Sequence, residues 1–186
     1  MDNFWFVNVN GDDVINDFDR TVIGNPQPDF IFGFNNQFGY KNFDLSIFFQ
    51  GSYGNDIWNG VRVSHEGMES TYNQFTSTLN RWNGKGSSNT MPRAIYADPN
   101  RNNRASTRWV EDGSYLRLKN LTFGYRFTQD WLKKIGAKSL RLYLSFDNLW
   151  TLTNYSGLDP EVGLWGLDYG IYPTSRVYMF GASVKF

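Results

Sequence analysis

The sequence predicts an all-β fold: an antiparallel segment of a transmembrane β-barrel, with about five strands and long extracellular loops. Several segments alternate apolar and polar residues with a period of two, which is typical of strands with one apolar and one polar face. Aromatic residues make up 18% of the chain, a content that suits the aromatic girdles of barrel walls. Short and long connections alternate along the chain, as they do in outer-membrane barrels.

The composition excludes several classes of function. The 18 Lys and Arg balance the 18 Asp and Glu, so nothing in the charge favours nucleic acid as a partner. Cysteine is absent, which excludes disulfide bonds, thiolate zinc sites and a cysteine nucleophile. No stretch approaches the roughly 18 consecutive apolar residues of a membrane-spanning helix. The first residues lack a secretory signal, so we expect a mature chain or a fragment, and we favour a fragment.

The first two strands form a predicted β-hairpin. In residues 30–39, one face carries four aromatic side chains: Phe30, Phe32, Phe34 and Phe38. In residues 43–50, one face is again apolar: Phe43, Leu45, Ile47 and Phe49. Lys41 and Asn42 are left for a tight turn between the two strands.

A long irregular segment, residues 51–112, precedes the third strand. It is rich in Gly, Asn, Ser and Arg, and we expect a short helix near residues 72–82. The third strand, residues 114–127, changes phase: its large apolar residues lie on one parity and then on the other, at Leu116 and Leu118, then Leu121, Phe123 and Tyr125. A β-bulge near Lys119 and Asn120 would bring both groups to one face.

The last two strands complete the predicted set. Residues 128–138 form a compact connection with one helical turn, and residues 139–150 alternate cleanly. A second irregular loop, residues 151–175, leads to the last strand, residues 176–186. With Phe186 at the periplasmic rim, the short connections lie on the periplasmic side and the long loops outside the cell, which is the arrangement of outer-membrane barrels.

The end of the chain favours the membrane reading over a soluble antiparallel sandwich, whose strands alternate in the same way. The last strand finishes at an aromatic residue, and we interpret four of its residues as a membrane insertion signal: Phe180, Gly181, Val184 and Phe186. Five strands cannot close a barrel, since about 8 is the usual minimum. We therefore expect one arc of a larger wall.

Four sequence blocks resemble the C-terminal part of SusC/RagA-type TonB-dependent outer-membrane transporters of the Bacteroidetes. The blocks cover residues 8–26, 43–56 and 109–125, and a last group that joins residues 148–161 to Tyr172-Pro173 and to residues 180–186. They occur in the right order over nearly the whole chain. The resemblance implies residues 1–29 as an extracellular loop and residues 30–186 as C-terminal barrel strands.

The resemblance also implies a function and partners. Transporters of this kind lie in the cell outer membrane, have about 22 strands and a plugged lumen, and import glycans or peptides. A SusD-like surface lipoprotein caps the barrel, and TonB supplies energy through N-terminal parts that this chain lacks. The expected partners are therefore that lipoprotein, the upstream barrel and plug, TonB, outer-membrane lipid, and an oligosaccharide or peptide substrate.

A loop before the first strand has the spacing of an EF-hand. Residues with suitable oxygen atoms occupy positions 1, 3, 5, 7 and 12 of that loop: Asn8, Asn10, Asp12, Val14 through its carbonyl, and Asp19. This set predicts a Ca²⁺ site. Asn8 replaces the usual Asp, and Asp13 stands at position 6, where a positive φ favours Gly. The alternative is an Asx-rich turn without a metal.

Other polar clusters do not predict an enzyme. His65 lies near Glu66 and Glu69, but a lone His in a long loop is expected to be solvated, so we reject a metal or acid–base site there. Asp112, Asp159 and Glu161 are interpreted as turn-forming residues and not as the paired carboxylates of a glycosidase.

Aromatic residues in the loops are candidates for substrate binding because their faces stack on sugar rings. The expected substrate-binding residues are Trp58, Trp82, Trp165 and Tyr169. Trp109 and Trp150 lie near strand ends and are equally well explained as girdle residues at the membrane boundary. The alternative function is a soluble carbohydrate-binding β-sandwich module.

Overall fold

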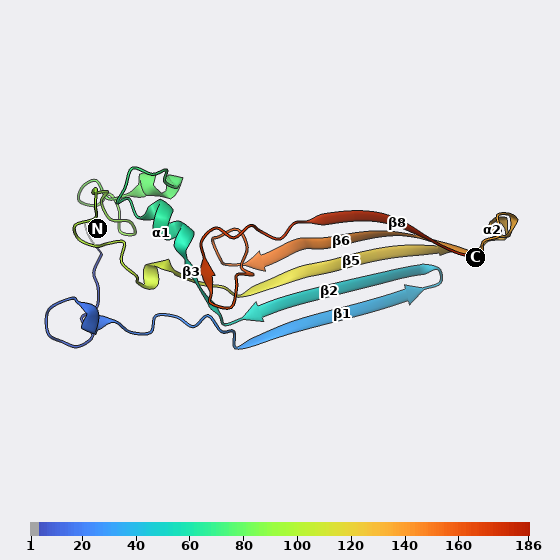
Figure 1. Cartoon of the computed structure of the whole chain (residues 1–186), viewed down its shortest axis with the longest axis horizontal. Coiled ribbons are helices and arrows are strands. Elements are labelled where there is room, and N and C mark those ends of the chain that lie inside the picture. Colours follow the sequence, from blue (N-terminus) through green and yellow to red (C-terminus); the bar gives the residue numbers. More distant parts are fainter. Residues whose placement is uncertain (1–3) are drawn as a thin grey trace. The chain divides into compact units, whose positions relative to one another are not determined.

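The computed structural model describes residues 4–186, which divide into two compact units (Figure 1). The sheet unit contains Pro28–Asn55, Asp112–Glu161 and Tyr172–Phe186. The loop unit contains the residues up to Gln27, with Asp56–Glu111 and Val162–Ile171. The chain therefore passes several times between a regular unit and an irregular one.

The sheet unit is one antiparallel sheet of five long strands (Figure 1). Its order is β1-β2-β5-β6-β8. The strands are β1 (Phe30–Tyr40), β2 (Phe43–Tyr53), β5 (Tyr115–Phe127), β6 (Ser139–Thr153) and β8 (Val177–Lys185). All five lie where the alternation predicted them. The two-residue turn between β1 and β2 is also confirmed, with Lys41 in the left-handed region at φ 54°.

The register places most of the large apolar residues of the five strands on one face, which we call the apolar face, whereas Ile31, Phe48 and Met179 lie on the opposite face. On β1, β2 and β5 this face carries Phe30, Phe32, Phe34, Phe38, Tyr40, Phe43, Leu45, Ile47, Phe49, Tyr53, Leu116, Leu118, Leu121, Phe123, Tyr125 and Phe127. On β6 and β8 it carries Leu140, Leu142, Leu144, Phe146, Trp150, Leu152, Tyr178, Phe180, Ala182 and Val184. These side chains are not a buried core: Phe34 is 57% exposed and Phe180 is 71% exposed.

The opposite, polar face is held together by hydrogen bonds and ion pairs. Arg141 binds both carboxylate oxygens of Asp44, at 2.9 and 2.5 Å, across the intervening strand β5. Farther along, the Asn120 amide donates to Asp147 (2.7 Å) and to Ser145 (3.2 Å). The sheet therefore has one predominantly apolar face and one predominantly polar face.

Two bulges at the same height keep this two-faced pattern in register. The pairing of β5 shifts at Lys119, which confirms the bulge predicted from the change of phase. A second irregularity, which the sequence did not predict, lies in β6: Leu118 pairs with Trp150, whereas Asn120 pairs with Asp147. Asn148 adopts φ 51° there, a conformation that Asn tolerates better than most residues.

The connection between β5 and β6 holds the predicted helical turn, α2 (Asp130–Lys134), with Leu132 buried. The structure describes no helix between residues 4 and 186 that is long and apolar enough to cross a membrane.

The loop unit has its own small core. Ile57 and Trp109 are fully buried, and Met68 and Met91 are nearly so. Its three-stranded sheet has the order β4-β3-β7, from Val110–Asp112, Asp56–Asn59 and Leu167–Asp168.

The loop unit also contains four short helices: α1 (Gly60–Glu66) and the 3₁₀ helices η1 (Asp17–Asp19), η2 (Thr76–Asn80) and η3 (Thr107–Trp109). The helix expected near residues 72–82 is η2, whereas α1 and the small sheet had no periodic signal.

Candidate functional site

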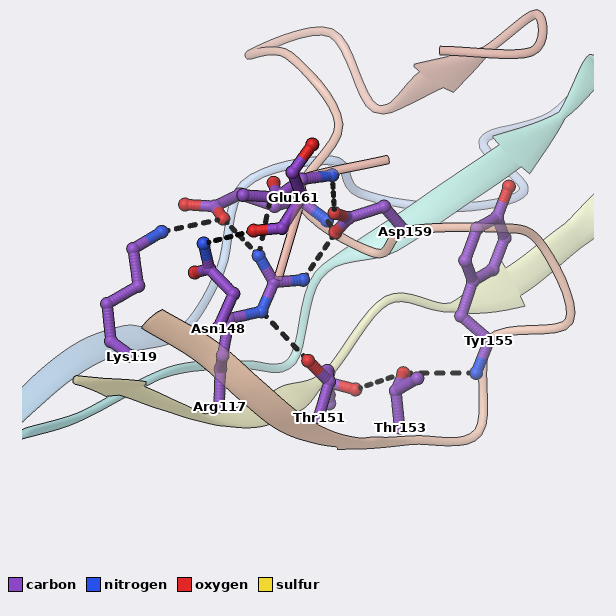
Figure 2. A network of polar contacts seen from close by, with 11 residues as sticks. Arg117, Lys119, Asn148, Thr151, Thr153, Tyr155, Asp159 and Glu161 are labelled. Carbon is purple, nitrogen blue, oxygen red and sulfur yellow. Dashed lines mark hydrogen bonds and ion pairs between the residues drawn. The ribbon is translucent and has the colours of Figure 1, made fainter. Parts of the chain in front are cut away.

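Arg117 lies at the centre of a polar network where β5 and β6 meet the loop that leads to β8 (Figure 2). The residue is only 3% exposed. Its guanidinium donates to the Thr151 hydroxyl (2.9 Å) and to two carboxylates, those of Asp159 (2.5 Å) and Glu161 (2.7 Å). A buried charge is stabilised only when its donors are well paired, and these acceptors supply that pairing.

Asp159 joins the two ends of the same loop. One carboxylate oxygen accepts from the Glu161 amide (2.9 Å), and the other accepts from the Thr174 amide (2.9 Å). Burial works against the charged form, but these two amides and the Arg117 guanidinium together hold the pKa of Asp159 below its ordinary value. Asp159 is therefore more readily ionised in the network than an ordinary aspartate.

This arrangement is not that of a glycosidase. A catalytic acid needs a raised pKa, whereas the pKa of Asp159 is lowered. Glu161 is held by Arg117 and by Lys119 at 3.3 Å. Asp112 accepts from the Ser114 amide, as expected of a turn-forming residue.

A second network lies inside the loop unit. Arg62 in α1 binds Glu66 at 2.9 Å and Glu111 at 2.8 Å. Ser77 donates to the other oxygen of Glu66 (2.8 Å), and Asn59 donates to Glu111 (3.1 Å). These contacts hold α1 to segments far away in the sequence.

His65 is only partly exposed and has structural partners, whereas the sequence predicted a solvated residue. Glu66 is buried within the network just described. The His65 ring stacks on Phe75 at 5.0 Å, and its Nδ1 lies 2.9 Å from the Val61 carbonyl. Both residues therefore have structural partners. The sequence did not predict these contacts, because α1 forms within a segment that has no regular period.

Trp109 is also a core residue, so neither a girdle role nor a sugar-stacking role fits it. It is fully buried and donates through Nε1 to the Arg104 carbonyl (3.2 Å). The guanidinium of Arg108 lies 4.0 Å from its ring centre and 4.5 Å from that of Phe4. Burial lowers the pKa of Arg108 to about 10.

Three of the four aromatic candidates for substrate binding come together at β3 and β7. The Trp58 amide donates to the Gly166 carbonyl (2.7 Å), next to Trp165. The Tyr169 ring lies over Gly60, where a Cβ would collide with it. Trp165 is 81% exposed and Tyr169 is 72% exposed, whereas Trp58 is half-buried. Trp82 lies elsewhere in the loop unit, where its backbone amide donates a hydrogen bond to the Met91 carbonyl.

The predicted Ca²⁺ loop has a left-handed residue at the position where an EF-hand has glycine. Asp13, at the position where Gly is favoured, adopts φ 62°. Asp19 accepts from the amides of Asn16 and Val9, both at 2.8 Å. The Asn16 amide has the largest effect in holding the pKa of Asp19 below its ordinary value. Within residues 4–186 no cluster of three or more His, Asp or Glu side chains is placed to hold a metal.

The residues of the predicted insertion signal lie on both faces of β8. Phe180 and Val184 are exposed on the apolar face. Gly181 lies on the polar face beneath the Tyr143 ring, which a Cβ would meet. Phe186 follows the strand, and its carbonyl accepts from Lys138 at 3.2 Å.

Comparison with known proteins finds relatives that match this chain over almost its whole length. No family model matches it. The chain is 40% identical over 192 residues to the TonB-dependent receptor P3 of Formosa agariphila and 33% identical over 187 residues to receptor P26 of the same organism. It is 29% identical over 186 residues to the TonB-dependent receptor SusC of Bacteroides thetaiotaomicron. These matches cover 97%, 95% and 97% of the chain.

Solved structures give the same answer for the fold. The RagAB peptide importer in its closed-closed state matches 89% of the chain with a TM-score of 0.77 and 26% identity. The open-open state matches 86% with a TM-score of 0.72, also at 26% identity. The chain spans only 17% to 19% of the length of these relatives. Its antiparallel sheet thus matches one part of a much larger protein.

Proposed function

We propose that this chain, a homologue of the SusC/RagA-type TonB-dependent receptors, forms an arc of the wall of an outer-membrane importer. The apolar face contacts lipid, and the polar face lines the lumen. The loop unit and the loop between β6 and β8 lie on the extracellular side.

The exposed apolar face is the observation that carries this proposal. In a soluble sandwich the same side chains would be buried against a second layer, but Phe34 and Phe180 are more than half exposed. In lipid, this exposure is favourable and the polar side chains turn toward the lumen. Aromatic pairs mark both ends of the face, with Phe30 on Tyr53 at 5.3 Å and Phe43 on Tyr125 at 4.6 Å. These pairs suit the two aromatic girdles of such a wall.

The relatives suggest what the complete importer does. The similar solved structures are those of a peptide importer, and the curated relatives are receptors. The chain is accordingly a transporter component and not an enzyme. We propose that it takes part in the uptake of a peptide or glycan with a SusD-like lipoprotein, and that TonB acts through parts of the importer outside this chain.

A matched pair of substitutions on β8 tests the placement in the membrane. We define the P3 chimera as receptor P3 with its matched segment replaced by this chain. Phe180 faces the proposed lipid and its neighbour Met179 faces the proposed lumen; both are exposed. Lysine at a lipid-facing midplane position costs about 2–4 kcal/mol. We expect Phe180→Lys to reduce the folded, heat-modifiable form in outer membranes, and Met179→Lys to leave it close to the parent level.

Equal tolerance of both substitutions would contradict the lipid contact, because a solvated Phe180 would accept lysine without loss. Equal sensitivity would show that β8 tolerates no charge on either face, and it would also contradict the proposed assignment of faces.

We also propose that the loop from Asn8 to Asp19 binds Ca²⁺. The observation that favours this is the positive φ of Asp13, which the EF-hand spacing requires at that position. Asn8, Asn10, Asp12 and Asp19 would provide side-chain oxygens, with the Val14 carbonyl as the fifth ligand. Calorimetric titration of the purified P3 chimera with Ca²⁺ should show binding that Asp19→Asn abolishes. Asp17→Asn, which alters an exposed carboxylate paired with Arg20, should leave it intact. Heats unaffected by Asp19→Asn would rule out this site.

A further inference from the structure

The loop from residue 159 to residue 174 is attached to the sheet in a way that an ordinary surface loop is not. Its two ends belong to the sheet unit, and the residues between them, 162–171, belong to the loop unit. Asp159 ties the outgoing end to the returning end through the Thr174 amide. Arg117 then ties both ends to β5, with Thr174 Oγ1 at 3.4 Å as a further acceptor. The returning end has one more contact, from Asn148 to the Ser175 carbonyl (3.0 Å).

The burial of Arg117 makes this attachment difficult to open. Figure 2 shows Thr151, Asp159 and Glu161 around its guanidinium. The hydroxyl of Thr174 is a fourth side-chain acceptor. Three of these belong to the loop, and they include both carboxylates. If the loop moved away, Arg117 would lose its counter-charges, and an uncompensated charge in a buried position is strongly unfavourable.

The middle of the loop forms its own hydrogen-bonded turn and has exposed apolar side chains. Its Asp168 carboxylate accepts from the amides of Gly170 (2.8 Å) and Ile171 (3.1 Å), which fixes a tight turn. Leu164, Trp165 and Tyr169 are exposed around that turn.

We propose that the two ends of this loop are fixed to the wall and do not open as the hinges of a lid, and that Arg117 is their positioning residue. The inference rests on the proposed function, which places this end of the sheet outside the cell. Arg117 itself is too buried to touch a ligand. Its role is to hold the two ends of the loop together on the sheet.

Spin labels at the two ends of the loop test this inference. The chain contains no cysteine, so single cysteines at Leu158 or Tyr172, both exposed, give unique labelling sites in a P3 chimera without other cysteines. In outer-membrane vesicles we expect immobilised spectra at both sites. Arg117→Met should convert each into a mobile spectrum, and Arg117→Lys should restore part of the immobilisation, because it returns the charge without the fork of donors.

Two further variants separate the loss of the loop attachment from other effects of a substitution on β5. Arg126→Met removes an exposed charge at the other end of the same strand, outside the network; it should leave both spectra immobile. Asp159 lies outside the long strands, so Asp159→Asn should not disturb membrane insertion. This variant should mobilise both labels, and it keeps the test informative if Arg117→Met prevents insertion.

Immobile labels in Asp159→Asn and in any inserted Arg117→Met would overturn the inference, and the proposed function would stand. Mobile labels in the parent chimera would also overturn it. Failure of the parent chimera to insert would instead contradict the proposed function.

Discussion

Gly124 lies between the partners of an ion pair that spans three strands. Its neighbours in the sheet are Asp44 on one side and Tyr143 on the other, and Arg141 reaches over it to the Asp44 carboxylate. A Cβ at this position would lie 2.6 Å from both Asp44 oxygens and 2.7 Å from the Arg141 guanidinium. Only glycine leaves room for the pair.

We therefore expect Gly124→Ala to destabilise the folded P3 chimera by about 1–3 kcal/mol, the usual cost of overpacking. The shift of the urea midpoint of the heat-modifiable band measures the effect. Gly39→Ala is the matched control, because a Cβ at Gly39 meets nothing within 4 Å. Similar shifts for the two variants would show that loss of glycine flexibility, and not the collision, is what matters.

The Asp159 carboxylate makes the attachment of the loop dependent on pH. Its pKa in the folded protein is lower than the ordinary value of 3.8. The stabilisation is therefore fully present above pH 3.8 and is lost as the pH falls through the lower, folded-state pKa. In a titration of the Leu158 spin label from pH 7 downward, we expect no mobilisation until the pH is below the ordinary value. Mobilisation between pH 5 and pH 7 would show that another group controls the loop.

At the scale of the elements, alternation located all five long strands because each has one lipophilic face. It also located the bulge at Lys119, since a bulge changes the parity of the residues on either side. The second bulge escaped prediction. Asn148 occupies a left-handed conformation inside β6, but the apolar residues on its two sides, Phe146 and Trp150, have the same parity, so the sequence shows no change of phase.

This second bulge gives a prediction about Asn148. A β-branched residue in the left-handed region is strained, at a cost of roughly 1–3 kcal/mol. Asn148→Val should lower the urea midpoint of the P3 chimera accordingly. Asn148→Gly should stay near the parent value, because glycine adopts a positive φ freely, although it loses the hydrogen bond to Ser175. A larger loss in the glycine variant would mean that this hydrogen bond matters more than the backbone conformation.

The candidate site was less predictable than the strands. Arg117 meets Asp159 across 42 positions of sequence and Thr174 across 57, and no local pattern announces such contacts. The one feature of the sequence that could have pointed to Arg117 is its position as a charged residue between apolar neighbours in a strand. Asp159 and Glu161 were expected to form turns, and the structure shows that they also neutralise Arg117. Trp109 seemed equivalent to other loop aromatics because its burial depends on a core that forms from distant segments.

At the scale of the whole molecule, the sheet has two edges that lack a neighbour among the described residues. β1 pairs only with β2, and β8 pairs only with β6. Unpaired edges beside an exposed apolar face favour association between chains. A barrel needs about 8 strands to close. Neither water nor detergent can replace the missing strands beside β1 and β8.

The isolated 186-residue chain should therefore fail to fold alone. After refolding from urea into plain buffer, we expect aggregates in size-exclusion chromatography, and after refolding into detergent micelles we expect no heat-modifiable band. The P3 chimera, treated in the same way, should give that band because its remaining strands pair with both edges. A monomeric isolated chain that unfolds in one cooperative step in plain buffer would contradict the membrane arc. It would show that the apolar face finds a partner within the chain itself.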